Sequence, residues 1–493
     1  MSRETALVTA DWVAENINNP HVAIVEVDED TTLYAQGHIE NAITFNWRED
    51  LQDGLRRDII SKEGFEALLS KSGISNDTTV ILYGGNNNWF AAYAYWYFKL
   101  YGHQDVRLID GGRKRWELDA RPFVTAVPTR TATRYVAKDQ DLTLRAFRDE
   151  VIAAIGVKNI VDVRSPAEFA LDHIPGAVNY PVLDNEERAK IGTLYKQESP
   201  FAAKKLGAAL VSKNIATHLE NHFLELPREW RPLIYCWRGG ERSGAFTHIL
   251  NRIGWKAKQL EGGYQGFRRT VIDGLDQAAG QFSFQVICGM TGSGKTRVLQ
   301  EIGALGAQIF DLEGLAVHRG SVLGNEPNED QPSQKGFETA LWNALRSLDP
   351  ARPVFVESES KKVGGLHVPD ALMEKIRNGS CVELRSSTQT RVSWLIREYH
   401  HFLTDTDNFK RKLALLTAHY GKVQIAKWNE AIDAGNFPEL VEELLVKHYD
   451  PSYQSSIVRN FPQYRIENFV QLDDDSDEAF ARAAKAIVSK LGA

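Results

Sequence analysis

Short apolar runs alternate with longer amphipathic stretches along most of this 493-residue chain. The runs at residues 25–28, 80–83, 161–164 and 232–235 each precede a loop and then a segment with helical periodicity. Buried strands that alternate with helices are typical of a parallel sheet covered on both faces. In such sheets, functional residues gather at the carboxyl ends of the strands. The pattern therefore predicts an α/β protein and directs attention to the loops after these strands.

Residues 1–125 and 140–275 repeat each other. Each copy has a first strand with a His-Ile turn after it, a second strand with a glycine-containing loop and a helix, and a final Gly-Gly turn at Gly111 or Gly262. The second copy is longer, and the polar, helical stretch at 184–213 accounts for the extra residues. Polar residues 126–141 predict a linker, and residues 274–280 predict a second boundary. We therefore expect domains at 1–125, 140–275 and 281–493.

The second copy has a cysteine, Cys236, directly after its apolar strand, whereas the first copy has Gly-Gly-Asn at residues 84–86. Two arginine charges, glycines that let the backbone curl around an anion, and a following helix N-terminus all favour a thiolate. We therefore predict that Cys236 is a nucleophile and that Arg238 and Arg242 hold an anion beside it. The rest of the predicted oxyanion loop is Trp237, Gly239, Gly240, Glu241 and Ser243.

The third region opens with an apolar strand at residues 282–288, followed by a phosphate-binding loop, G-x-x-x-x-G-K-[ST], and a helix. In this motif backbone N–H groups cradle phosphates, the lysine neutralises them, and the hydroxyl can reach a Mg²⁺ ion. The predicted phosphate-binding residues are Gly289, Thr291, Gly292, Ser293, Gly294, Lys295 and Thr296.

Two further apolar strands in this region end in acids. We favour Asp311 and Glu357 as the residues that hold Mg²⁺ or a water molecule, as acids at neighbouring strand ends do in phosphate-loop enzymes. Glu313 and Arg319 lie close by in the sequence and are candidates for the same site or for substrate contact. The alternative interpretation is that these acids are ordinary solvated strand ends.

The two repeats resemble the rhodanese family, on the strand at 162–164, the turn at 173–176, the loop cysteine and the turn at 261–263. The resemblance implies an α/β fold: two rhodanese-like parallel-sheet domains, followed here by a P-loop NTPase-like α/β domain with a helical C-terminal part. It also implies that Cys236 carries sulfur as a persulfide. The first copy lacks a thiol at this position and is expected to be an inactive module.

From residue 140 to the C-terminus the chain resembles the tRNA 2-selenouridine synthase family. The motifs lie at residues 185–197, 236–243, 261–267, 289–296, 311–320 and 331–334. The resemblance implies that selenium from selenophosphate replaces the sulfur of 2-thiouridine at the tRNA wobble position. A geranyl group from geranyl diphosphate first makes that sulfur a better leaving group. Residues 1–125 depart from the family and resemble half of a tandem thiosulfate sulfurtransferase.

The spacing of Cys236 and Arg242, C-x5-R, equals that of a phosphatase loop and would admit a phosphate-like oxyanion. Our hypothesis is that Arg238, Arg242 and the loop amides hold selenophosphate while the Cys236 thiolate accepts selenium as a perselenide. A separate hypothesis is that the phosphate loop, with Mg²⁺, binds geranyl diphosphate rather than a nucleotide. No intrinsic metal site is predicted.

The implied partners are tRNA and an enzyme that supplies selenophosphate. The net charge of −7 argues against nucleic-acid binding by the whole surface, but residues 385–427 mix basic and aromatic side chains. That segment could contact tRNA or form amphipathic helices with a solvated basic face. Three cysteines, no apolar run of membrane-spanning length and a polar N-terminus predict a cytoplasmic protein with no membrane association. The oligomeric state stays open.

Three other functions compete with this interpretation. A thiosulfate or mercaptopyruvate sulfurtransferase fused to a small-molecule kinase would explain the repeat. A phosphatase would explain the C-x5-R loop, although Tyr235 stands where such enzymes usually have histidine. A non-enzymatic tRNA-binding scaffold would leave both Cys236 and Lys295 replaceable.

Overall fold

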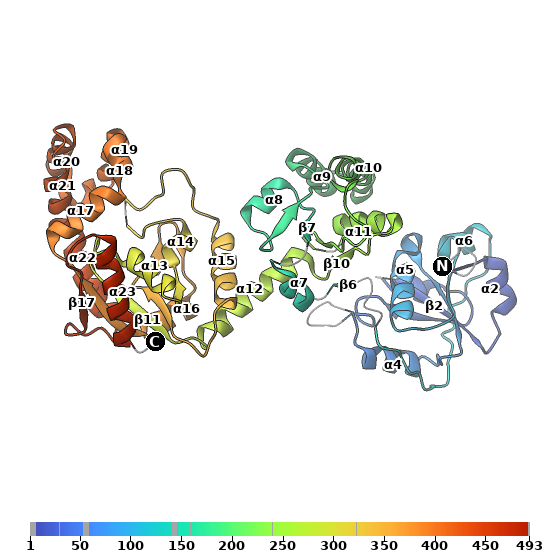
Figure 1. The fold of residues 1–493 in the computed structure, drawn as a ribbon. Helices are drawn as coiled ribbons and strands as arrows, with labels where there is room; N and C mark the ends of the chain where they lie inside the picture. Colours follow the sequence, from blue (N-terminus) through green and yellow to red (C-terminus); the bar gives the residue numbers. More distant parts are fainter. Residues whose placement is uncertain are drawn as a thin grey trace. The chain divides into compact units, whose positions relative to one another are not determined.

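The computed structural model divides the chain into two compact units, Met1–Leu144 and Arg145–Ala493 (Figure 1). The structure describes residues 6–28, 30–52, 59–140, 145–146, 148–156, 159–238, 240–321 and 323–491. None of the described helices combines the length and the apolar character needed to cross a lipid bilayer.

The first unit is built on a five-stranded parallel sheet in the order β1-β5-β4-β2-β3. Alternate residues of an inner strand, such as Val25 and Ile24, enter separate apolar clusters, so helices cover both faces. The strands are β1 (Leu7–Val8), β2 (Val22–Asp28), β3 (Ala42–Asn46), β4 (Thr79–Tyr83) and β5 (Val106–Ile109), and the helices are α2 (Ala10–Asn16), α3 (Thr32–Gln36), α4 (Lys62–Lys71), α5 (Gly85–Leu100) and α6 (Gly112–Leu118).

The predicted linker packs along this first unit instead of leaving it. Tyr135 is buried, stacks edge-on against Phe65 and contacts the ring of His103. The sequence predicted a linker because this stretch is mostly polar. It packs on the first unit because burial of one aromatic ring contributes more to stability than the polarity of the neighbouring residues opposes.

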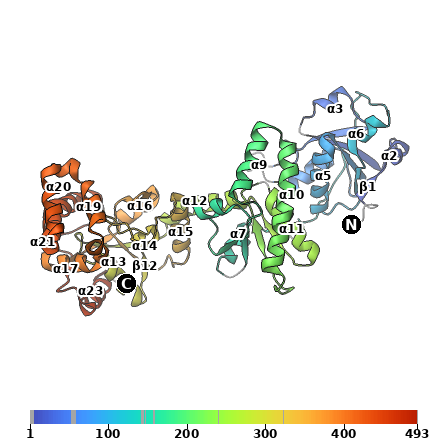
Figure 2. The ribbon, with the colours of Figure 1, turned by 90° about the horizontal axis from the view of Figure 1, so that it is seen from above.

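The second unit begins with a sheet in the order β6-β10-β9-β7-β8, which repeats the strand order of the first unit. The internal repeat predicted from the sequence is therefore confirmed as a repeat of topology. Its strands are β6 (Arg145–Ala146), β7 (Ile160–Asp162), β8 (Ala177–Asn179), β9 (Leu233–Tyr235) and β10 (Lys258–Leu260). Its helices are α7 (Arg148–Ala154), α8 (Pro166–Leu171), α9 (Asn185–Gln197), α10 (Pro200–His218), the π-helical turn η2 (Leu219–Phe223), α11 (Glu241–Ile253) and α12 (Gly263–Ala279). The extra residues at 184–213 fall in α9 and α10, which pack side by side (Figure 2).

The second unit continues with a parallel sheet in the order β12-β13-β11-β16-β17. Its strands are β11 (Phe284–Cys288), β12 (Gln308–Phe310), β13 (Val354–Glu357), β16 (Ser380–Arg385) and β17 (Phe469–Gln471), with a small hairpin of β14 (Lys362–Val363) and β15 (Leu366–His367). Around it lie α13 (Lys295–Ala304), α14 (Leu312–Ala316), α15 (Gln334–Arg346), α16 (Asp370–Arg377) and α23 (Asp477–Leu491). This sheet and its helices are called the P-loop module below, and the preceding sheet and its helices the rhodanese module.

A cluster of helices is inserted between β16 and β17. It comprises α17 (Thr388–Glu398), α18 (His400–Thr404), α19 (Thr406–Ala414), α20 (Thr417–Asp433), α21 (Phe437–Leu444), the π-helical turn η3 (Leu445–Tyr449) and α22 (Asp450–Asn460). Its own apolar core includes Phe402, Phe409 and Trp428. The predicted fold class, two rhodanese-like parallel-sheet domains and a P-loop domain with a helical C-terminal part, is confirmed.

The rhodanese and P-loop modules share one apolar core within the second unit. Helix α12 spans the predicted boundary at 274–280 and packs against α15 and α16. At Gly274 a Cβ atom would lie 2.5 Å from the indole nitrogen of Trp342, so this glycine lets the two helices approach closely. The buried carboxylate of Asp172 accepts hydrogen bonds from Tyr264 in α12 (2.7 Å) and Thr339 in α15 (3.0 Å). The two modules are therefore joined by both apolar and polar contacts.

Candidate functional site

Cys236 lies directly after β9, and its side chain is almost fully buried. The Ser243 hydroxyl lies 3.3 Å from Sγ and donates to it, while the Gln259 amide donates to the Ser243 oxygen at 2.9 Å. Gly240 has a φ of 81°, and a Cβ atom there would lie 2.3 Å from the Gln259 amide nitrogen. Only glycine fits at this position, and it lets α11 begin beside the sulfur with its N-terminus toward the loop.

The two arginines of the loop stand in different environments. Arg242 donates to Glu168 at 2.7 and 3.3 Å, and both side chains are mostly buried. Burial alone would raise the pKa of Glu168, but the hydrogen bond and charge of Arg242 outweigh it and hold that pKa below its ordinary value. Arg242 thus reaches the loop paired with Glu168, whose carboxylate also lies 3.8 Å from Arg188, whereas Arg238 is exposed. The role predicted for Arg242 in holding an oxyanion stays a prediction, and the structure adds Glu168 to it.

The remaining loop residues take separate positions. Trp237 stacks on Tyr264 with ring centroids 5.3 Å apart, and Glu241 is exposed in the first turn of α11. Gly239 lies outside the described residues. Glu168 and Gln259 were missed from the sequence. The only local signal for Glu168 is the Ser165-x-x-Glu168 pattern, which indicates a helix start and is observed as one.

In the first unit, Gly84 alone separates β4 from α5, where five residues separate β9 from α11. The Gly85 N–H donates to the carboxylate of Asp28 at 2.7 Å. A backbone donor that an active loop would turn toward an anion is therefore occupied by a side chain of the same unit. This arrangement fits the expected inactive module.

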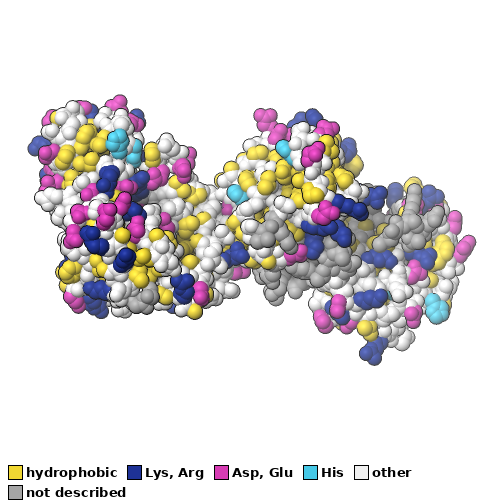
Figure 3. Space-filling model, in the orientation of Figure 1, with side chains coloured by type: hydrophobic (Ala, Val, Ile, Leu, Met, Phe, Trp, Pro, Cys, Tyr) yellow, Lys and Arg dark blue, Asp and Glu magenta, His cyan; other side chains and the backbone are white. Residues whose placement is uncertain are grey.

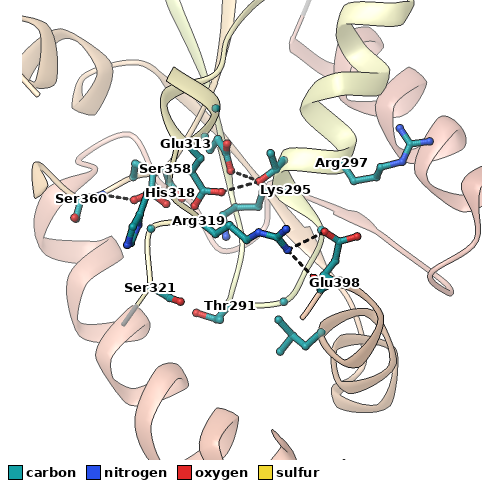
Figure 4. Close-up of a pocket in the computed structure, with 18 of the residues that line it drawn as sticks. Thr291, Lys295, Arg297, Glu313, His318, Arg319, Ser321, Ser358, Ser360 and Glu398 are labelled. Atoms are coloured by element: carbon teal, nitrogen blue, oxygen red, sulfur yellow. Dashed lines mark hydrogen bonds and ion pairs between the residues drawn. The ribbon is translucent and has the colours of Figure 1, made fainter. Parts of the chain in front are cut away.

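The phosphate-binding loop connects β11 to α13 and lines a cavity of about 680 Å³ (Figure 4). Lys295 donates to the carbonyl of Gly289 at 2.9 Å, and the Thr296 hydroxyl donates to Glu357 at 2.9 Å and to Glu313 at 3.1 Å. Gly294 has a φ of 78°, and a Cβ atom there would lie 2.5 Å from the ring of Phe480. The predicted residues Thr291, Gly292, Gly294, Lys295 and Thr296 all line the cavity; Ser293 is buried beneath the loop and its hydroxyl has no partner among the described residues.

Buried acids face Thr296 across this cavity. Burial, and then the like charge of Glu359, raise the pKa of Glu357, and burial with Glu357 raises that of Glu313. Oxygen Oε1 of Glu357 has no hydrogen-bond partner within the described part of the chain. Such a site favours a cation, which would relieve the repulsion between the carboxylates.

No group of three or more metal-ligating side chains capable of holding a metal on its own occurs among the described residues. Mg²⁺ commonly needs only one or two carboxylates, with water and substrate phosphates completing its shell, so Thr296 and Glu357 fit this ion. A bound ion would supply charge neutralisation for phosphate groups. Asp311, which we favoured for this task, also lines the cavity, where its carboxylate caps α14 by accepting from Gly314 at 2.8 Å, and its role stays a prediction. Glu313, two residues later, accepts from Thr296.

An apolar pocket adjoins the phosphate-loop cavity and was not foreseen from the sequence. The two share Thr291, Ser321, Leu395, Tyr399 and Tyr449. The rest of the apolar lining is Leu323, Ile396, Phe402, Leu403, Phe409, Phe437, Val441, Leu444 and Leu445. Leu323 comes from the loop between α14 and α15, and the other residues come from α17 to η3. Their convergence therefore depends on how these segments pack and carries no signature in the sequence.

Arg319 lines the cavity, and its guanidinium group forms ion pairs with acidic side chains. It contacts Glu326 at 2.7 Å and Glu398 at 3.2 Å, and its guanidinium lies 5.0 Å from the ring centroid of Tyr399 (Figure 4). Any substrate that Arg319 contacts must therefore compete with these carboxylates.

The 385–427 segment forms amphipathic helices, and several of its aromatic rings point inward. Phe402 is buried in the helical core and Trp394 packs against Phe480, so neither is free to stack on a base. Arg391 is also buried, in an ion pair with Asp450. On the face drawn in Figure 3, acidic and basic side chains are mixed rather than gathered into a basic surface. The interpretation as amphipathic helices is favoured over a base-stacking platform.

Comparisons with known proteins find matches in both the N-terminal and the C-terminal parts of the chain. Residues 282–414 match the tRNA 2-selenouridine synthase AAA domain, and residues 9–119 and 147–270 match the rhodanese-like domain. A Saccharopolyspora erythraea protein with the provisional name thiosulfate sulfurtransferase is 58% identical over 197 residues, covering 37% of this chain and 70% of the relative. A Mycobacterium leprae protein with the same provisional name is 55% identical over 253 residues, 51% of this chain and 90% of the relative. The sulfur carrier protein TtuD of Thermus thermophilus is 45% identical over 196 residues, 36% of this chain and 69% of the relative.

Proposed function

Because this chain belongs to the rhodanese family and carries the AAA domain of tRNA 2-selenouridine synthases, we propose that it replaces sulfur with selenium in tRNA 2-thiouridine. The two matched families support a transferase that acts in sulfur or selenium modification of tRNA. The finer proposal names selenophosphate and geranyl diphosphate as co-substrates, wobble uridine as the target and the cytoplasm as the compartment. An enzyme that makes selenophosphate would be the natural supplier.

The observation that carries the proposal is that the phosphate-loop cavity, of about 680 Å³, and an apolar pocket of about 50 Å³ share five lining residues. A prenyl diphosphate has a doubly charged head and a branched hydrocarbon tail, which match a phosphate loop beside an apolar pocket. A nucleotide would leave the apolar lining without a use. In this arrangement Lys295 neutralises the diphosphate, the thiouridine sulfur attacks C1 of the geranyl group, and diphosphate leaves.

The selenium step is assigned to Cys236. Its thiolate attacks the selenium of selenophosphate, an S–Se bond forms, and the Se–P bond breaks with its electron pair left on phosphorus as phosphite. The bound selenium then attacks C2 of the geranylated uridine, and geranylthiolate leaves. A cellular thiol finally reduces the S–Se bond, forming a disulfide with the Cys236 sulfur and leaving selenium on the base.

The test is mass spectrometry of nucleosides from tRNA incubated with the protein, selenophosphate and geranyl diphosphate. We expect Cys236→Ser to accumulate geranylated thiouridine without selenouridine, and Lys295→Ala to lose geranylation. Selenouridine made by Cys236→Ser would refute the perselenide. Release of phosphate instead of phosphite, followed by ³¹P NMR, would mean that selenium passes directly from selenophosphate to the base.

A second candidate function is thiosulfate or mercaptopyruvate sulfurtransfer, which the provisional names of the relatives favour. There the Cys236 thiolate attacks the outer sulfur of thiosulfate and sulfite leaves. Formation of thiocyanate from thiosulfate and cyanide, by protein that leaves thiouridine unmodified, would support this function over the first.

A further inference from the structure

The P-loop module contributes a positive charge to the loop of Cys236. Lys335, the second residue of α15, places its ammonium group 5.8 Å from the ring centroid of Trp237, the residue directly after the nucleophile. The Lys335 side chain is exposed, and none of the described carboxylates pairs with it. This lysine lies about a hundred residues beyond the loop in sequence, in a different module.

The backbone of Lys335 is held against the rhodanese module by neighbouring contacts. Arg268 of α12 forms an ion pair with Glu338 and donates to the carbonyl of Lys335 at 3.4 Å. One residue before α15, the Ser333 hydroxyl donates to the carbonyl of Leu171 in α8. These contacts on both sides of Lys335 fix the position of its backbone, and therefore the point from which its side chain extends.

The charges around the Cys236 loop explain why a lysine at position 335 would affect anion binding. Arg242 is paired with Glu168, so Arg238 is the loop arginine that has no carboxylate partner among the described residues. A tetrahedral oxyanion that carries a terminal sulfur or selenium has two or three negative charges and calls for more than one cation.

We propose that Lys335 is a specificity-determining residue of the Cys236 site, where its charge attracts an anionic sulfur or selenium donor. This inference rests on the proposed function for the identity of the donor, thiosulfate or selenophosphate. The charge itself can be tested without any donor.

The experiment compares alkylation of Cys236 in the full chain by iodoacetate, an anion, and by iodoacetamide, its neutral counterpart. The modified Cys236 peptide is quantified by mass spectrometry, which separates it from Cys288 and Cys381. The variants are Lys335→Ala, Lys335→Glu and Lys335→Arg. The control is Lys485→Ala, because Lys485 is an exposed lysine on α23, which packs on α13 and the opposite side of the P-loop sheet from α15.

We expect Lys335→Ala to lower the iodoacetate-to-iodoacetamide rate ratio about two- to fivefold, with a larger drop for Lys335→Glu. Lys335→Arg should restore the ratio and Lys485→Ala should leave it unchanged. An unchanged ratio in both Lys335→Ala and Lys335→Glu, or an equal drop in Lys485→Ala, overturns the proposal.

A second arm measures the loading of Cys236 from thiosulfate and from selenophosphate. The KM for the donor that the site uses should rise in Lys335→Ala, while kcat stays within twofold. If wild-type protein makes no selenouridine yet the alkylation ratio still depends on Lys335, the proposed function fails and the role of Lys335 stands, with thiosulfate as the donor.

Discussion

Replacing Glu168 by glutamine should destabilise the second unit in a pH-dependent way. The substitution keeps an oxygen that can accept from the Ser165 N–H at the start of α8 but removes the charge opposite Arg242. Breaking a fully buried ion pair by neutralising one partner costs about 3–5 kcal/mol. Here both side chains keep some exposure, 20% for Glu168 and 14% for Arg242, and glutamine still accepts a hydrogen bond. We therefore expect a loss of about 1–3 kcal/mol at pH 7.5.

The pH dependence follows from the lowered pKa of Glu168 in the folded protein. A carboxyl with a depressed folded-state pKa stabilises the fold above its unfolded pKa of about 4.3, and this contribution is lost as the pH falls through the folded value. The difference between Glu168→Gln and wild type should therefore shrink below pH 4.

The assay is urea unfolding followed by tryptophan fluorescence, with hydrogen exchange at residues 240–250 as a local readout because a multidomain chain need not unfold in one step. The matched control is Glu187→Gln, which alters a capping carboxylate at the start of α9 that hydrogen-bonds Asn214 and no arginine among the described residues. An equal destabilisation at pH 7.5 and at pH 4, or equal effects of the two substitutions, would refute the electrostatic reasoning.

Two further substitutions test the P-loop module. Glu357→Gln should stabilise the metal-free protein by roughly 3–5 kcal/mol at pH 8 and leave its stability unchanged at pH 4. The pKa of Glu357 is raised to about 8 in the folded protein, so the fold loses stability as the pH rises above the unfolded-state pKa. The substitution should also abolish the Mg²⁺ dependence of geranyl transfer. Thermal melts at the two pH values, with and without Mg²⁺, measure both effects, and equal stabilisation at both pH values would contradict the assignment. Leu403→Trp should fill the apolar pocket and raise the KM for geranyl diphosphate about tenfold or more without altering selenium loading of Cys236. An unchanged KM in steady-state geranylation assays would remove the pocket from the tail-binding role.

The sequence predicted the elements whose signals are local. The strand before Cys236, the phosphate loop and the repeated strand order all follow from apolar runs and glycine positions within short windows, and each is observed. The partners of these elements could not be predicted in the same way. Glu168 reaches Arg242 from 74 positions away, and Lys335 approaches Trp237 only because α12 and α15 pack together. Asp311 and Glu313 both line the cavity, and only the fold shows that Glu313 accepts from Thr296 while Asp311 caps α14.

The shared core of the rhodanese and P-loop modules also bears on how such chains can be recombined. A gene fusion or an expression vector that cut the chain between α12 and β11 would separate Trp342 from Phe267, which pack against each other, and would leave Asp172 without the Thr339 hydroxyl. A cut just before Arg145 would sever neither contact. Recombination at the boundary between the two units therefore keeps the nucleophile and the phosphate loop together.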